Sequence, residues 1–233
     1  MRAPTSRQAI CAAAAAARFA VCDVNLRPPY TDASVVAAAV RNSDLLKLND
    51  DELLPVTASI LEDSGLTSEE RADAQRAYEA ARLADQIRTF KICNQKPNDA
   101  ARAIARAAAL LGKAVDVSTI VVTRGSLGAV LWESSDPCDA GSLEFEGGTA
   151  WACNGFLAPV VADTVGAGDA FLAAFLASRL RDPENVAASL ESGCRLGAFV
   201  AGCTGATPEH CAAKIRSLDP RDRGDGDVVF RLI

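Results

Sequence analysis

The sequence predicts an α/β fold, with a mainly parallel, twisted sheet and helices on both of its faces. Short apolar runs such as Val117–Val122 are rich in β-branched residues, which is typical of a buried parallel strand. Alanine-rich stretches such as 67–89 have the composition of helices. A glycine-rich turn at 163–169 joins an apolar run to a predicted helix over Ala170–Leu180. We therefore expect strands and helices to alternate along the chain.

Length and composition indicate a soluble globular protein. The 233 residues are enough for one large domain, expected over residues 1–233. In the tail at 219–233, the charged part at 219–227 is expected to be mobile and Val228–Ile233 is expected to add a strand. Hydrophobic residues make up 49% of the chain and charged residues 23%, in the normal range for such proteins. The net charge of -6 argues against a nucleic acid partner, which needs a basic surface. No run reaches the ~20 apolar residues of a membrane span, so we expect a cytoplasmic protein.

The cysteines and the chain start give weaker signals. The 8 cysteines include no Cys-x-x-Cys pair and there is one histidine, so zinc-site spacing is absent and reduced core cysteines are expected.

At the start, Arg2 and Arg7 precede an alanine run without an acid. This segment is either a targeting peptide or a helix that leads into a buried strand over 19–24. We favour the helix, and organellar targeting stays open.

The segment Asp163-Thr-Val-Gly-Ala-Gly-Asp-Ala-Phe171 puts a glycine-rich turn at a helix start. Free backbone N–H groups and the helix dipole favour a bound anion at such a position. Asp169 follows in the first helical turn, where a carboxylate could accept a proton from a hydroxyl beside a transferring phosphoryl group. The alternative is a structural connection in which Asp169 caps the helix.

This segment closely resembles the C-terminal signature of the ribokinase-like (PfkB) carbohydrate kinases. The resemblance implies that Asp169 is the catalytic base of ATP-dependent phosphorylation of a hydroxyl on a sugar or related small molecule. The implied anion hole consists of the backbone amides of Gly166, Ala167 and Gly168. The resemblance further implies that Asp163 and the carbonyl of Val165 hold a monovalent cation such as K⁺.

A second glycine-bearing turn follows the strand at 117–122. By itself it reads as a tight turn in a hairpin over 117–132, whose glycines allow a close backbone approach. It also resembles the family's Thr-x-Gly-x-x-Gly-Ala element, which lies on the ATP phosphates. A later Gly-Ala turn after the helix at 186–201 resembles another part of the nucleotide site. The implied nucleotide-binding residues are Thr123, Arg124, Gly125, Ser126, Gly128 and Gly205.

Polar residues also follow two earlier predicted strands, where α/β sheets bind ligands. Asn49 and Glu52 are spaced i, i+3, which suits either a water-mediated Mg²⁺ site or a helix-capping arrangement. They resemble the family's Asn-x-x-Glu motif, which positions Mg²⁺ and phosphate. The turn with Asn25 and Arg27 resembles the Asp-Pro-Asn-x-Arg stretch of the fructokinase-like branch, although Val24 replaces the proline. The resemblance implies that Asn25 and Arg27 face the phosphates or the sugar.

The resemblance covers only the later part of the family's pattern. Nothing before Val21 resembles the first sugar-binding strands or the lid, so an N-terminally truncated fold with one bare sheet edge is expected, and a homodimer stays open. A non-catalytic nucleotide-binding remnant is the alternative function. A dinucleotide-binding oxidoreductase fits poorly, because no Gly-x-Gly-x-x-Gly opens a first βαβ unit. We also expect Gly112 to end a helix over 98–111.

Overall fold

The computed structural model describes residues 3–29, 31–90, 99–134, 147–158, 160–209, 211–218 and 228–232. The chain divides into two compact units. The first unit comprises Met1–Val122, Leu131–Ala150 and Leu232–Ile233, and the second comprises Thr123–Val130 and Trp151–Arg231. The single domain over residues 1–233 stays a prediction.

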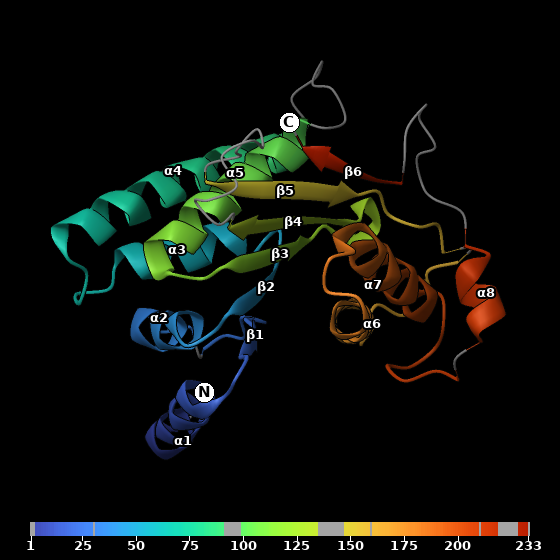
Figure 1. Ribbon diagram of the computed structural model, residues 1–233, viewed down its shortest axis with the longest axis horizontal. Helices are drawn as coiled ribbons and strands as arrows, with labels where there is room; N and C mark the ends of the chain where they lie inside the picture. The colour runs from blue at the N-terminus through green and yellow to red at the C-terminus, as the bar shows by residue number, and fades with distance from the viewer. Residues whose placement is uncertain are drawn as a thin grey trace. The chain divides into compact units, whose positions relative to one another are not determined.

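A six-stranded sheet has its strands in sequence order. The strands are β1 (Val21–Asp23), β2 (Leu45–Asn49), β3 (Thr119–Thr123), β4 (Ala129–Ser134), β5 (Gly148–Cys153) and β6 (Val229–Leu232). β1 pairs with β2 in parallel, with Cys22 opposite Leu46. β3 and β4 form the predicted hairpin through the 3-10 turn η1 (Gly125–Leu127), and Figure 1 shows β4 running against β3. The sheet is therefore mixed, and together with the helices it confirms the predicted α/β class.

Among the described residues, the first unit contains five helices. They are α1 (Pro4–Ala16), α2 (Ala33–Arg41), α3 (Leu53–Leu61), α4 (Ser68–Phe90) and α5 (Asp99–Val115). α4 packs along α5, α3 packs on α4, and α2 packs on α3. Fully buried side chains from β2, α3, α5 and β3 make up much of the core of this unit; they include Leu46, Leu48, Ile60, Leu111 and Ile120.

The predicted helix end at Gly112 is wrong, because α5 continues through this residue to Val115. Gly112 lies against the ring of Trp132, and a Cβ built on it would be 2.4 Å from Trp132 Cζ3. The glycine is needed for this close approach of helix and strand rather than for a left-handed helix end.

The second unit contains α6 (Ala167–Arg181), α7 (Val186–Ala201) and α8 (Ala212–Arg216). α6 packs against α7, and the rings of Phe171 and Phe175 on α6 stack with centroids 6.1 Å apart. Gly193 of α7 makes room for Phe171, because a Cβ there would lie 2.9 Å from the ring. The contact explains why α7 carries a glycine at this position.

Three further expectations have different outcomes. The buried strand over 19–24 is wrong in its burial, because β1 is an edge strand and Val21 is 37% exposed. Of the tail, 219–227 lie outside the described residues, and the strand expected over Val228–Ile233 is β6. In the part of the chain that the structure describes, no helix is long and apolar enough to cross a membrane.

Candidate active site

The start of α6 leaves backbone donors without an internal partner. Gly166 is the N-cap, with φ 81°, and no side chain caps the helix. The amide of Ala167 donates to Thr164 O at 3.2 Å, and that of Ala170 to Gly166 O at 2.8 Å. Within the described residues, the amides of Gly168 and Asp169 have no acceptor. The helix begins three residues before the predicted Ala170, so Ala167 and Gly168 are its first residues.

Asp169 lies in the first turn of α6 with an exposed side chain. Its carboxylate accepts no hydrogen bond and forms no ion pair with the described residues. The alternative in which Asp169 caps its own helix therefore receives no support. An unengaged carboxylate beside free amides is suited to accept a proton near a bound anion.

The segment before α6 is tied to the C-terminal end of α7. The amides of Ala162 and Asp163 both donate to Ala201 O, at 2.9 and 3.3 Å. Asp163 Oδ1 accepts from the amide of Val165 at 3.0 Å, which closes a local turn. A Cβ on Gly166 would lie 2.6 Å from Ala206 O. The structure thus brings the turn at 163–168 against the Gly205-Ala206 turn.

The turn from Thr123 to Gly128 packs on the backbone that follows β5. Gly125 and Gly128 have φ 53° and 89°, which favours glycine at both positions. A Cβ on Gly128 would lie 2.0 Å from Cys153 O, and one on Gly155 would lie 2.0 Å from Ser126 O. Gly155 was not predicted from the sequence, although Asn154-Gly155 after an alternating strand is a turn signal. Gly125 and Ser126 remain exposed.

In the first unit, Glu52 joins the two turns that follow β1 and β2. Its Oε1 accepts from the amide of Leu26 at 2.6 Å, and its Oε2 accepts from the amide of Asn49 at 2.9 Å. Glu52 is 7% exposed, whereas Asn25 and Arg27 are exposed at the end of β1. The contact to Asn49 closes the turn after β2 without capping α3, which begins at Leu53 and has no side-chain cap. The contact to Leu26 is one that spacing could not predict.

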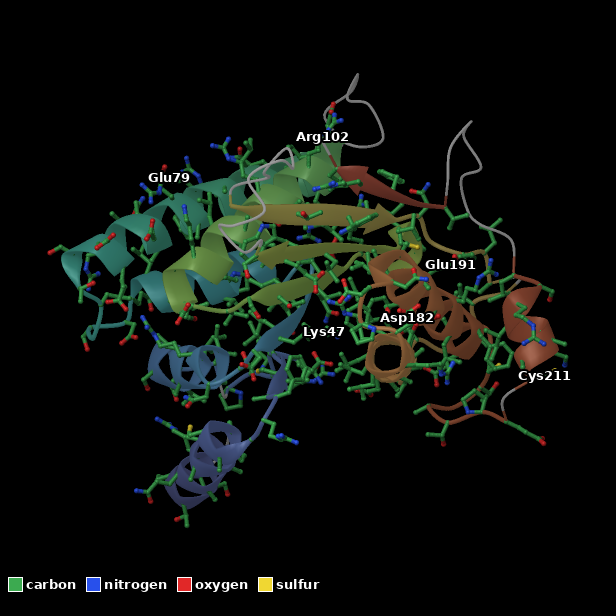
Figure 2. All side chains as sticks on the ribbon, viewed as in Figure 1. Lys47, Glu79, Arg102, Asp182, Glu191 and Cys211 are labelled. Atoms are coloured by element: carbon green, nitrogen blue, oxygen red, sulfur yellow. The ribbon has the colours of Figure 1, made fainter. Side chains whose placement is uncertain are left out.

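A partly buried ion pair lies beside these turns. Lys47 is 3% exposed, and its Nζ lies 3.1 Å from Asp23 Oδ1 and 3.3 Å from Asn49 Oδ1. Figure 2 labels Lys47 on β2. Burial, together with the carboxylates of Asp23 and Glu52, raises the pKa of Cys22 to about 11, so this thiol stays protonated at neutral pH. The pair was missed, although a lysine inside the apolar run of β2 was a signal that it needed a partner.

The side-chain oxygens of Asn49 and Glu52 do not form a metal site made of protein ligands alone. Both Glu52 oxygens already accept a backbone hydrogen bond, and Asn49 Oδ1 faces a cation. The described ranges contain no group of three or more His, Cys, Asp or Glu side chains that could hold a metal ion. These residues therefore suit a water-mediated contact to an ion better than direct coordination.

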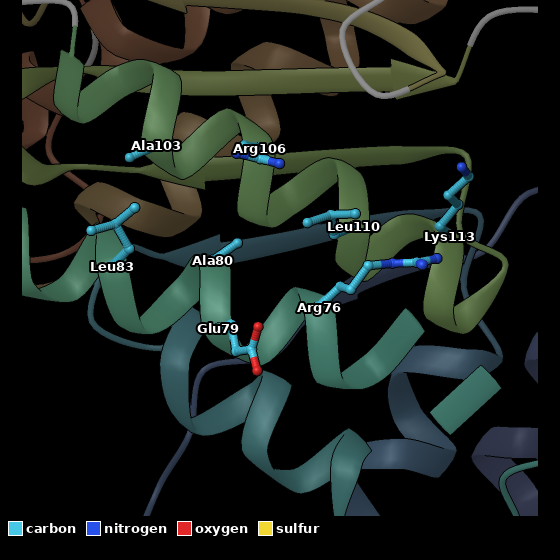
Figure 3. Close-up of a pocket in the computed structure, with 8 residues that line it drawn as sticks. All are labelled: Arg76, Glu79, Ala80, Leu83, Ala103, Arg106, Leu110 and Lys113. Carbon is cyan, nitrogen blue, oxygen red and sulfur yellow. The ribbon is translucent and has the colours of Figure 1, made fainter. Parts of the chain in front are cut away.

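A groove of about 630 Å³ lies between α4 and α5, and Figure 3 shows its lining. Three cationic side chains and one acid line it over an apolar floor; they are Arg76, Arg106, Lys113 and Glu79. None of the residues singled out in the sequence lines this groove. It is therefore separate from the candidate site.

Residues 89–211, a little more than half of the chain, match the pfkB family carbohydrate kinase model. The chain belongs to this family. The matched range contains the Thr123–Gly128 turn and the start of α6. No curated protein matches the chain.

Three solved structures are similar to this chain, at identities that show the fold alone. Microbiome-derived acarbose kinase Mak1 is 19% identical, with a TM-score of 0.50 over 91% of this chain and 52% of that chain. A PfkB protein from Polaromonas sp. JS666 is 18% identical, with a TM-score of 0.49 over 92% and 51%. Aminoimidazole riboside kinase from Salmonella enterica, complexed with aminoimidazole riboside and an ATP analog, is 20% identical, with a TM-score of 0.45 over 81% and 47%. The chain thus spans about half the length of these structures.

Proposed function

We propose that this chain takes part in ATP-dependent phosphorylation of a hydroxyl on a sugar or related small molecule. The observation that carries the proposal is the open start of α6 beside the unengaged carboxylate of Asp169. Asp169 accepts the proton of the acceptor hydroxyl, which makes the oxygen a better nucleophile. Membership of the pfkB family supports the same chemistry.

The anion hole is formed by the amides of Gly166, Ala167 and Gly168. Those of Gly166 and Gly168 have no acceptor within the described residues, so they are ready to donate to a phosphoryl oxygen. The amide of Ala167 first has to leave Thr164 O, to which it donates at 3.2 Å. The dipole of a 15-residue helix adds to the attraction for an anion at this end.

ATP lies on the turn that contains Thr123, Arg124, Gly125, Ser126 and Gly128, with Gly205 at its other side. Support comes from the two left-handed glycines, which keep the turn narrow, and from the exposure of Gly125 and Ser126. Asn25 and Arg27 contact phosphate or sugar oxygens. Their exposure at the end of β1 agrees with that role, and the turn favours the fructokinase-like branch.

Two cations have candidate positions. Asn49 and Glu52 hold Mg²⁺ through water, because the Glu52 oxygens already accept backbone hydrogen bonds. Bound with the nucleotide, Mg²⁺ would neutralise charge on the phosphates. Asp163 and the Val165 carbonyl hold a monovalent cation such as K⁺, and the turn closed by Asp163 keeps these two groups near each other.

A non-catalytic nucleotide-binding remnant is the second candidate. This candidate predicts ATP binding without turnover. We also propose that the protein is located in the cytoplasm and that two copies pair along the exposed edge of β1.

The test is Mg²⁺-dependent ADP release from ATP over a panel of fructose, ribose, ketodeoxygluconate and nucleosides. Asp169→Asn is compared with Asp182→Asn, which makes the same charge change at the exposed C-terminal end of α6. Turnover that depends on the sugar and is lost only in Asp169→Asn supports the kinase. Bound ATP without turnover for any acceptor supports the remnant and refutes catalysis by this chain.

A further inference from the structure

The turn after β1 is held in an unusual conformation by hydrogen bonds on both sides. Asn25 has φ 41°, in the left-handed region that residues with a Cβ seldom adopt. The amide of Val24, just before it, donates to Lys47 O at 3.1 Å. The amide of Leu26, just after it, donates to Glu52 Oε1 at 2.6 Å. The conformation of Asn25 is thus set by groups from the next strand and its turn.

The carboxylate of Glu52 contacts backbone amides rather than solvent. It is 7% exposed, and its second oxygen accepts from the amide of Asn49 at 2.9 Å. One carboxylate therefore links the turn after β1 to the turn after β2. Its contact with Leu26 joins residues that are 26 positions apart in the sequence. A buried carboxylate that accepts two backbone hydrogen bonds is stabilised by them, since charged acceptors form the stronger bonds.

Lys47 also contacts residues of these two turns. Its Nζ contacts both Asp23 oxygens at 3.1 Å and Asn49 Oδ1 at 3.3 Å. Asn49 is consequently held at its amide by Glu52 and at its side chain by Lys47. Asp23, at the end of β1, is held by the same ammonium group.

We propose that Glu52 is a positioning residue whose carboxylate fixes the turn after β1 by holding the amides of Leu26 and Asn49, without a metal ion. The turn then presents Asn25 and Arg27 in one orientation. What these two residues bind rests on the proposed function, whereas the clamp itself does not. Glu52 thereby acts on the reaction through the backbone.

Amide hydrogen exchange of the full chain, followed by NMR, tests the clamp. Glu52→Gln retains one acceptor oxygen, so it can hold only one of the amides of Leu26 and Asn49. The other should exchange roughly 10- to 100-fold faster, because a hydrogen bond to a charged acceptor is lost. Asp51→Asn makes the same charge change on an exposed neighbour and should leave both amides as in the wild type. Unchanged protection of both amides in Glu52→Gln overturns the proposal.

The wild type alone provides a second test should the variant fail to fold. Protection of the Leu26 amide should be equal in EDTA and in MgCl₂, because the contact is between protein atoms. Protection that arises only with MgCl₂ overturns the proposal and makes Glu52 a metal-dependent group. Equal protection in a chain that releases no ADP supports the clamp while refuting the proposed kinase.

In a chain that turns over, the kinetics separate positioning from nucleotide binding. Glu52→Gln should lower kcat by about 100-fold, the size of effect seen when reacting groups are misplaced by about an ångström. A raised KM for ATP with an unchanged kcat contradicts the positioning role.

Discussion

Two helix starts, those of α4 and α6, treat their free backbone amides in opposite ways. At α4, Thr67 Oγ1 accepts from the amide of Glu70 at 3.3 Å, and Glu70 Oε2 accepts from the amide of Thr67 at 2.7 Å. This is a reciprocal capping box, further supported by Arg41 on Glu70. At α6 the cap is a glycine, and the amides of Gly168 and Asp169 have no acceptor among the described residues.

The start of α4 therefore uses its backbone donors within the fold, whereas the start of α6 leaves donors available to a ligand. A side-chain cap typically contributes about 1 kcal/mol, so an uncapped start gives up stability that the sequence could have gained. α7 follows α4 in being capped, because Asn185 Oδ1 accepts from the amide of Ala188. α1, α2, α3 and α8 also lack a side-chain cap, so the start of α6 is distinguished by its glycine N-cap and by the unengaged carboxylate of Asp169, within the segment proposed as the anion hole. Substitutions at closed and open starts should have opposite effects on stability and activity.

The largest expected effect is on catalysis at the open start. Asp169→Asn should lower sugar-dependent ADP release by about 10²- to 10⁴-fold, the usual contribution of a general base. The melting temperature should stay unchanged, because the Asp169 side chain is exposed and has no hydrogen bond or ion pair with the described residues. Asp182→Asn serves as the matched control in both measurements. A folded Asp169→Asn with full activity would show that the open start is not the reaction site.

The next effect concerns the glycine that shapes the open start. Gly166→Ala should lower the free energy of unfolding by about 3 kcal/mol, from an unfavourable left-handed residue and a new overlap with Ala206. Gly205→Ala has a similar φ of 84° but open space around its Cβ, so it should cost only about 1–2 kcal/mol. Urea unfolding of both variants measures the difference. Equal losses would mean that the packing of Gly166 on Ala206 adds nothing.

Removing the cap at the closed start of α7 should lower stability and leave activity unchanged. Asn185→Ala removes the cap of α7 and should lower the free energy of unfolding by about 1 kcal/mol, with ADP release per folded molecule unchanged. Asn185→Asp keeps an acceptor oxygen and should retain most of the stability. Thermal unfolding together with the kinase assay checks this prediction. A loss of activity without a loss of stability would remove the distinction between the two kinds of helix start.

The smallest effect is on pH dependence at the closed start of α4. Hydrogen bonds from Thr67, and then from Arg41, lower the pKa of Glu70 from 4.5 to about 2. Because the folded pKa lies below the unfolded one, this stabilisation is fully present above pH 4.5 and is lost as pH falls through about 2. Glu70→Gln should therefore melt below the wild type at pH 6, with the gap closing toward pH 2. Glu69→Gln, an exposed neighbour, should show no such trend.

Local signals in the sequence were reliable where adjacent residues decide the structure. The hairpin over 117–132 was predicted from a β-branched run, two glycines and a second alternating run, and the structure confirms it. The helix predicted over 186–201 is α7 with the same bounds. Gly112 shows the limit of such reasoning, because the residue that explains it, Trp132, lies 20 positions away.

The α/β class and the family-like turn at 163–169 could be predicted from the sequence, because strand and helix propensities and a long motif depend on neighbouring residues. The three-dimensional structure was needed to show that both oxygens of Glu52 accept hydrogen bonds from backbone amides, and that Lys47 is buried against Asp23. It also decided that the amides at the start of α6 stay open. The physical reason is that a hydrogen bond or an ion pair depends on distance in space, and residues 24 to 26 positions apart meet only once the strands have paired.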